Sequence, residues 1–105
     1  EKKINVNRKN KYKITSMDNH FCQYYLRLNV SDKPGVLASI AMEFGQKNIS
    51  ISSVLQKDLH DDGSADLVIM TYPSLERDMQ TSIKQINNLD TVFNIESMIR
   101  VESYN

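Results

Sequence analysis

The chain has 105 residues, of which thirteen are lysine or arginine, thirteen are acidic and one, Cys22, is a cysteine. This length predicts one domain with a modest core, and the balanced charge offers no overall field that would attract nucleic acid or an anionic membrane. No apolar run of transmembrane length and no signal peptide is visible, and a single cysteine excludes an internal disulfide. We therefore expect a cytoplasmic protein with neither nucleic-acid nor membrane partners.

Residues 1–20 are enriched in basic side chains and contain neither glycine nor proline. Ile4 and Val6, and later Tyr12 and Ile14, alternate with polar residues, a pattern compatible with short strands. Because aromatic residues are sparse, a connector that docks on a neighbouring domain is favoured over a basic arm for nucleic acid. The chain begins with glutamate rather than methionine, so we expect it to be part of a longer polypeptide.

A strand and then a helix are expected beyond this segment. Apolar residues alternate with polar ones over residues 24–30, which predicts a strand. Apolar residues at helical spacing then predict a helix from Val36 to about Lys47. Asn48 is expected to end this helix in the left-handed conformation, which asparagine tolerates well.

The junction between these two elements, Ser31-Asp32-Lys33-Pro34-Gly35-Val36-Leu37, has the composition of a helix start. Asp32 suits the cap or the position before it, Pro34 suits the first turn, and Gly35 suits a close approach by backbone or by a ligand. The amides of Gly35, Val36 and Leu37 would lack intrahelical partners at the positive end of the helix dipole. These amides would form a binding site for a carboxylate or another anion, or they would belong to a capped helix start that binds nothing.

Two more strands and a hairpin are expected next. Residues 49–57 predict a strand whose alternation breaks at Ser52-Ser53-Val54, which indicates a bulge, and its serines are typical of an edge strand. Turn-forming residues over 58–64 predict a hairpin. The nearly continuous apolar run over 65–72 predicts a central strand.

A second helix and a last strand complete the chain. Tyr72-Pro73-Ser74 is expected to start the helix, with Ser74 as its cap and Asn87-Asn88 at its end. The buried face of this helix would consist of Leu75, Met79, Ile83 and Ile86. The last strand is expected over residues 92–102, with Ile95, Ile99 and Val101 facing inward and Glu96, Arg100 and Glu102 facing outward.

The predicted order is β-α-β-β-α-β within about 80 residues, a length that fits one domain. Two right-handed β-α-β units interleave as a ferredoxin-like α+β sandwich, in which a four-stranded antiparallel sheet carries both helices on one face. The other face of the sheet is left to a partner, to a second domain or to solvent.

No catalytic or metal site is predicted. In the aspartate-rich loop, counting from Asp58 places Ile69 where a calcium-binding EF-hand loop needs a bidentate glutamate. His20 and Cys22 lack a third group that would orient a catalytic pair. An RNA-recognition domain has the same order of elements, but it would need exposed aromatic and basic residues in the strand over 65–72.

Asp32-Lys33-Pro34-Gly35-Val36-Leu37 and Asn48-Ile49-Ser50-Ile51 resemble two segments of the ACT domain, an amino-acid-sensing module of metabolic enzymes. More narrowly, the chain resembles the C-terminal ACT domain of bacterial homoserine dehydrogenases in Tyr24-Tyr25-Leu26-Arg27-Leu28, in the run from Ile49 to Lys57 and in Met98-Ile99-Arg100-Val101-Glu102. The resemblance covers residues 24–102. Residues 1–23 would then be the end of a catalytic region and its linker, and residues 103–105 a C-terminal tail. Lys33 stands where arginine is common in the family, and Asn48 where glycine is frequent.

The resemblance implies that an amino-acid effector lies between two self-associated copies of the domain. One copy would contribute Asp32, Lys33, Pro34, Gly35, Val36 and Leu37, and the other would contribute Asn48, Ile49 and Ser50. The loop amides would hold the effector carboxylate, Asp32 would meet the ammonium group, and Ser50 would contact the effector.

The function implied is that of a regulatory domain without catalysis of its own. The parent enzyme would be a homoserine dehydrogenase of threonine and methionine biosynthesis, which reduces aspartate semialdehyde to homoserine with NAD(P)H. The nicotinamide cofactor would bind outside this segment, and threonine is the expected effector. Two alternatives remain open: a purely structural module for oligomerisation, and a free-standing amino-acid sensor.

Overall fold

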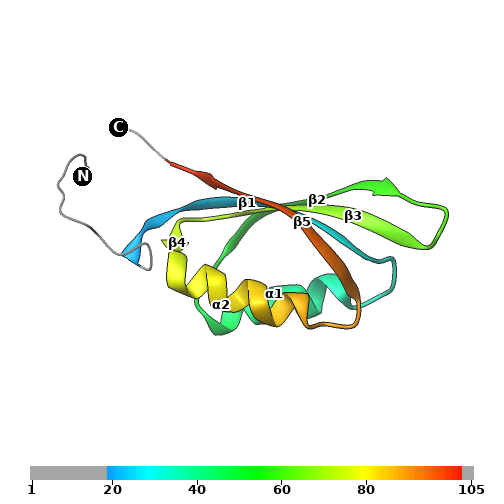
Figure 1. Cartoon of the computed structure of the whole chain (residues 1–105), viewed down its shortest axis with the longest axis horizontal. Helices are drawn as coiled ribbons and strands as arrows, with labels where there is room; N and C mark the ends of the chain where they lie inside the picture. Colours follow the sequence, from blue (N-terminus) through cyan, green and yellow to red (C-terminus); the bar gives the residue numbers. More distant parts are fainter. Residues whose placement is uncertain (1–18, 103–105) are drawn as a thin grey trace.

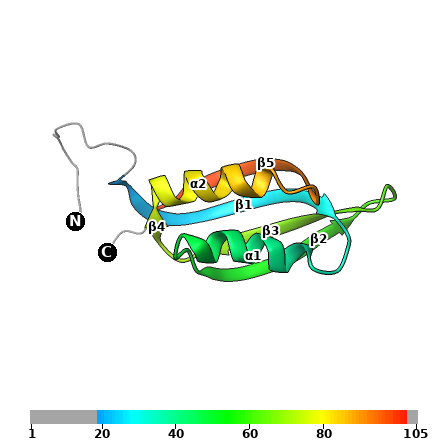
Figure 2. The same cartoon turned by 90° about the horizontal axis from the view of Figure 1, so that it is seen from below.

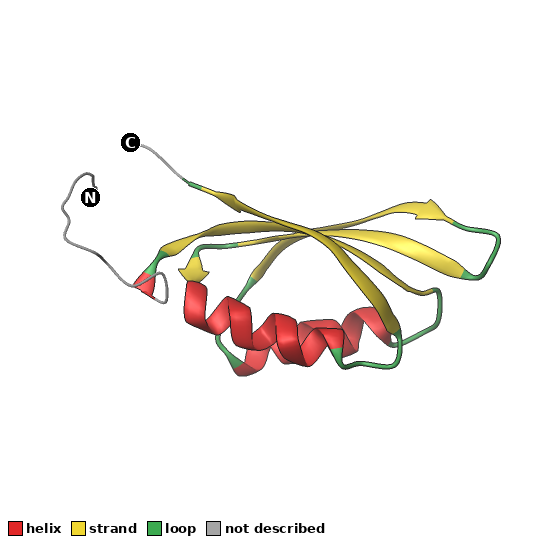
Figure 3. Cartoon of the chain, viewed as in Figure 1, coloured by secondary structure: helices red, strands yellow, loops and turns green. Residues whose placement is uncertain are grey.

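The computed structural model describes residues 19–102, so the short strands expected near Ile4 and Tyr12 and the tail over 103–105 lie outside the described residues. The elements, shown in Figures 1 and 3, are β1 (Phe21–Ser31), α1 (Val36–Gln46), β2 (Ile51–Leu59), β3 (Ser64–Thr71), β4 (Ser74–Leu75), α2 (Glu76–Asn87) and β5 (Val92–Val101). All strand pairs are antiparallel, in the order β2-β3-β1-β5, and the two-residue β4 pairs with the first residues of β1. The predicted ferredoxin-like fold is confirmed.

Both helices lie on one face of the sheet, as Figure 2 shows from the helix side, and the core fills the space between them and the sheet. Period-2 alternation places every second residue of β1 in this core. The largest fully buried side chains are Tyr24, Leu26, Leu28, Ile40, Phe44, Ile69, Met79 and Ile86. Within residues 19–102, neither helix lies on the opposite face of the sheet.

Both helices begin differently from the prediction. The residue before α1 is Gly35, at φ 87°, and no side chain caps the helix, so the expected roles of Asp32 as cap and Pro34 in the first turn are wrong. A Cβ on Gly35 would meet no atom within 4 Å, so the glycine is required by its backbone conformation and not by crowding. Ser74 pairs with Cys22 in β4 and does not cap α2, which starts after Leu75.

The predicted helix ends and the edge strand are confirmed. Asn48 has φ 58°, directly after the C-terminal cap of α1, and α2 ends at Asn87. β2 lies at the end of the sheet, and its register with β3 shifts between Ile51 and Ser53, at the predicted bulge. The β2–β3 hairpin closes through a bond from the His60 amide to the Ser64 carbonyl, at 2.8 Å.

The predicted facing of β5 is correct only in its first half. Ile95 pairs with Leu28 and packs against the core, but Ser97 pairs with Arg27, so Glu96 is an extra residue in the ladder. One extra residue reverses the facing of every later side chain. Met98 therefore packs against the core, whereas Ile99 is 52% exposed. The inward placement expected for Ile99 and Val101 and the outward placement expected for Arg100 are wrong.

The reversal predicts unequal effects of substitution at two adjacent apolar residues. Met98→Ala is expected to lower the free energy of unfolding by about 2 kcal/mol, because it removes a side chain packed against the core. Ile99→Ala is expected to cost about 0.5 kcal/mol or less, because its side chain lies on the uncovered face. Urea unfolding of both variants measures the difference. Equal losses, or a larger loss for Ile99→Ala, would contradict the bulge at Glu96.

Candidate functional site

A pocket of about 160 Å³ lies beside the N-terminus of α1, at the β2 edge of the domain. Its polar wall comes from Ser31, Asp32 and Lys33 of the β1–α1 loop, and its apolar wall includes Val36 and Leu37 of α1. Val54 and Gln56 of the edge strand close its outer side. The volume is below the range of drug-sized sites, so the pocket suits a small ligand.

The loop that forms the polar wall is held from both sides. The Ser31 amide donates to the Thr91 carbonyl at 2.7 Å, and the Asp32 amide donates to the Gly63 carbonyl at 3.0 Å. The Val36 amide makes a long bond of 3.4 Å to the Lys33 carbonyl. The first-turn amides of α1 therefore lie near the wall of the pocket with at most weak internal bonding, in the positive field of the helix end.

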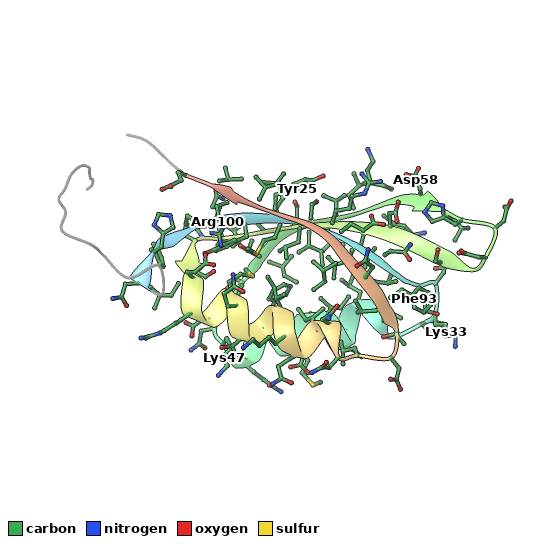
Figure 4. The ribbon with its side chains drawn as sticks, viewed as in Figure 1. Tyr25, Lys33, Lys47, Asp58, Phe93 and Arg100 are labelled. Carbon is green, nitrogen blue, oxygen red and sulfur yellow. The ribbon has the colours of Figure 1, made fainter. Side chains whose placement is uncertain are left out.

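The nine residues predicted for the effector site divide into two groups. Asp32, Lys33, Val36 and Leu37 line the pocket, and Pro34 and Gly35 lie in the same loop but do not line it. Asn48, Ile49 and Ser50 follow the opposite end of α1. A helix of 11 residues spans about 16 Å, so one small ligand cannot contact both groups within a single chain. Figure 4 shows Lys33 and Lys47 well apart in the helical layer.

Exposed apolar side chains lie on α1 and β2, and two of them, Leu37 and Val54, line the pocket. Leu37 and Met42 on α1 are 41% and 62% exposed, and Val54 on β2 is 37% exposed. α1 has neither an acidic residue in its first turn nor a basic one in its last turn, in contrast to α2. The α1–β2 side therefore offers a weakly charged surface beside the open backbone edge of β2.

A second site, which the sequence did not predict, is a buried polar cluster at the N-terminus of α2. The Glu76 carboxylate accepts bonds from the Tyr24 hydroxyl at 2.6 Å, from Gln80 Nε2 at 2.6 Å, and from Arg100 through Nε at 2.8 Å and through an Nη atom at 2.6 Å. Its backbone amide donates to the His20 carbonyl at 2.8 Å. The sequence signal was Tyr24, whose place among inward residues of β1 brings a hydroxyl into the core that needs a partner.

The electrostatics of this cluster favour one fixed protonation state. The bonds from Arg100 lower the pKa of Glu76 to about 2 against the opposing effect of burial. Burial raises the pKa of Tyr24, and the bond to Glu76 adds to it. Burial likewise raises the pKa of the Cys22 thiol. A carboxylate that stays charged and hydroxyl and thiol groups that stay neutral suit a structural role and not acid–base catalysis.

A third polar cluster lies on the uncovered face of the sheet. Arg27 reaches Asp66 at 3.0 Å, Asp58 at 3.4 Å and Glu96 at 3.5 Å. The bond from Arg27, followed by that from Asn29, lowers the pKa of Asp66. These residues come from four strands, β1, β2, β3 and β5, and link the hairpin to the centre of the sheet.

Within residues 19–102, neither helix has the length and apolarity that crossing a membrane requires. The chain spans about a fifth of the length of the curated relatives that it matches. It is 39% identical to a homoserine dehydrogenase of Neisseria gonorrhoeae over 86% of this chain and 21% of that protein.

Solved structures agree with this similarity. The crystal structure of a homoserine dehydrogenase from Thiobacillus denitrificans superposes with a TM-score of 0.77 at 33% identity, over 86% of this chain and 20% of that one. The ACT domain of a GTP pyrophosphokinase from Chlorobium tepidum, at 16% identity, shares the fold with a TM-score of 0.56 over 78% of this chain and all of that one. The sequence profile of the ACT domain matches residues 24–91, and the chain belongs to the ACT domain family.

Proposed function

We propose that this chain is the amino-acid-binding regulatory region of a homoserine dehydrogenase of threonine and methionine biosynthesis. The parent enzyme would be cytoplasmic and would reduce aspartate semialdehyde to homoserine with NAD(P)H, bound outside this segment, under feedback by threonine. Residues 1–23 would join the domain to the catalytic region. The similarity to homoserine dehydrogenases over most of this chain supports the proposal, as does membership of the ACT family.

The proposal that the domain binds an amino acid rests on the pocket beside the N-terminus of α1. A free amino acid has one carboxylate, one ammonium group and a small side chain. The first-turn amides of Val36 and Leu37 suit the carboxylate, and the Asp32 carboxylate suits the ammonium group. The apolar wall suits the aliphatic part of the ligand.

A second copy would supply the residues that one chain cannot bring to this pocket. If two copies pack with their α1 helices antiparallel about a two-fold axis, the N-terminus of one α1 lies beside the C-terminus of the other. Asn48, Ile49 and Ser50 of the second copy would then approach the pocket of the first. The exposed Leu37 and Val54 and the open edge of β2 support self-association on this side.

Gly35→Asp is expected to weaken threonine binding at least about tenfold, which corresponds to about 1.4 kcal/mol. The new carboxylate would repel the ligand carboxylate at the helix end. Gly35→Ala is the matched control, because both variants pay the cost of a side chain at φ 87°, about 1 kcal/mol, but only one adds charge. Calorimetry with threonine, isoleucine, methionine and lysine measures binding, and sedimentation reports the assembly. Equal affinity of the two variants for threonine would overturn the proposed carboxylate-binding site at the N-terminus of α1.

The same surface also supports the structural alternative. An apolar α1 side and an open strand edge would assemble copies of the domain even without a ligand. A dimer that binds none of the amino acids tested would favour that role. The free-standing sensor is distinguished by the reading frame upstream of Glu1, which would then encode no dehydrogenase.

A further inference from the structure

The sheet face opposite the helices has an apolar end and a charged end. We call it the open face and define it by Leu55 of β2, Tyr25 and Arg27 of β1, Met70 of β3 and Ile99 of β5. Tyr25 pairs with Met70 on one side and Ile99 on the other, and Leu55 and Ile99 are 58% and 52% exposed. Figure 4 shows Tyr25 and Asp58 projecting from this face, away from the helices. No described residue covers it.

The charged end of the open face lies at the β2–β3 hairpin and is acidic. A broad groove of about 440 Å³ there is lined by Asn29, His60, Asp61, Asp62, Ser64 and Glu96. The Arg27 guanidinium beside it is shared among Asp58, Asp66 and Glu96, which leaves the carboxylates in excess. An occupant of the whole face therefore needs apolar side chains at one end and cations at the other.

The N-terminal segment, residues 1–18, has the complementary charge. It contains six basic residues and two acidic ones, which leaves seven basic and eleven acidic residues in the rest of the chain. The net charge of zero is therefore the sum of a basic N-terminal segment and an acidic remainder of the chain. The basic residues are Lys2, Lys3, Arg8, Lys9, Lys11 and Lys13.

The apolar and basic residues of this segment follow one another in the same order as the apolar and charged ends of the open face. The segment joins the chain just before β1, at the apolar end of the face, and the hairpin lies at the other end of the sheet, as Figure 1 shows. β1 has 11 residues and spans about 36 Å, whereas 18 extended residues reach about 59 Å. A chain folding back from Phe21 would place Tyr12 and Ile14 over the apolar end and Arg8, Lys9 and Lys11 near the hairpin.

We propose that residues 1–18 dock across the open face of their own domain, with Tyr12 and Ile14 on the Tyr25–Met70–Ile99 row and the basic residues against the acidic hairpin. This interaction is independent of the amino-acid site, which lies on the other side of the sheet at the β2 edge. It would bring the first residues of the chain to the hairpin end of the domain.

A spin label on Lys9→Cys tests the docking in the whole chain, because Cys22 is buried and only the new thiol is accessible. Paramagnetic broadening is expected at the backbone amides of Asn29 and Ser64, and not at Met42 or Lys84 on the helix side. Raising the salt from 0.1 M to 1 M is expected to reduce the broadening about threefold or more, because the screening length falls from about 10 Å to about 3 Å. Broadening confined to residues next to Phe21, or located on the helices, would overturn the proposal.

Two neutralised variants make the test specific. The double variant Asp61→Asn/Glu96→Gln removes two charges from the acidic groove and is expected to lose most of the broadening. The control double variant Glu43→Gln/Asp78→Asn removes two charges on the helix side and is expected to keep it. Broadening of isotope-labelled chains by separate spin-labelled chains would assign the face to a second copy instead. If the label perturbs the fold, Lys9→Gln with Lys11→Gln replaces it, and unchanged chemical shifts at Asn29 and Ser64 would overturn the docking.

Discussion

Glu76→Ala is expected to lower the free energy of unfolding by about 3 kcal/mol, near the lower end of the range for breaking a buried ion pair. Glu76 is buried, with a side-chain exposure of 3%, and its loss leaves the Tyr24 hydroxyl and the Arg100 guanidinium without their acceptor. The one-third exposure of Arg100 keeps the cost from being larger. Thermal or urea unfolding measures it.

An adjacent exposed pair provides the matched control. Arg77 and Asp78 approach only to 4.0 Å and the Arg77 side chain is 60% exposed, so Arg77→Ala is expected to cost about 0.5 kcal/mol or less. Glu76→Met combined with Arg100→Met is expected to cost less than the sum of the two single changes, because it leaves no unpaired charge. Additive losses would show that the two side chains do not act as a pair.

The same carboxylate makes stability depend on pH in a defined window. The pKa of Glu76 in the folded state is about 2, below its ordinary value of 4.5, so its contribution is complete above about pH 4.5 and is lost as the pH falls toward 2. Glu76→Ala is expected to flatten the decline in stability over this window. The flattening is partial, because the pKa values of Asp62 and Asp66 are also lowered. An unchanged slope would contradict the role of Glu76.

In the full-length enzyme that we propose, deletion of residues 24–102 is expected to leave turnover and abolish the response to threonine. The described residues hold a core, the small pocket beside α1 and the open groove at the hairpin, and the groups with large pKa shifts lie in a structural cluster around Glu76. For an effector to act, it must bind one arrangement of paired domains more tightly than another. A coupling of about 1–3 kcal/mol would change the affinity of one site for its ligand about 5- to 150-fold when the other site is occupied.

The assay compares the intact enzyme, the truncated enzyme and the intact enzyme carrying Gly35→Asp over a range of threonine concentrations. Gly35→Asp is expected to reproduce the insensitivity of the truncated enzyme while keeping the assembly, with Gly35→Ala as control. A truncated enzyme that stays threonine-sensitive would refute the regulatory assignment. A truncated enzyme without turnover would favour the structural module.

The position of the pocket explains why the sequence identifies the part of the proposed site that one chain provides. The loop from Asp32 to Leu37 is contiguous, so local rules for helix starts identified it, and four of its residues line the pocket. The cap itself was predicted wrongly, because Gly35 at positive φ takes the place of a side-chain cap at Asp32. Whether Ser50 joins the site depends on a second copy, which the alternation and spacing of one chain do not encode.

Local periodicity and turn chemistry were sufficient to predict the order of the two helices and the four long strands, the edge strand, the left-handed Asn48 and the hairpin, but not the short β4. Only the tertiary structure decided the facing of β5, because a single extra residue at Glu96 reverses the side chains after it. The reversal turns Arg100 inward, where it meets Glu76 and Tyr24 from distant parts of the chain. A charge that periodicity assigns to solvent becomes buried when an opposite charge from another element offsets the cost of removing it from water.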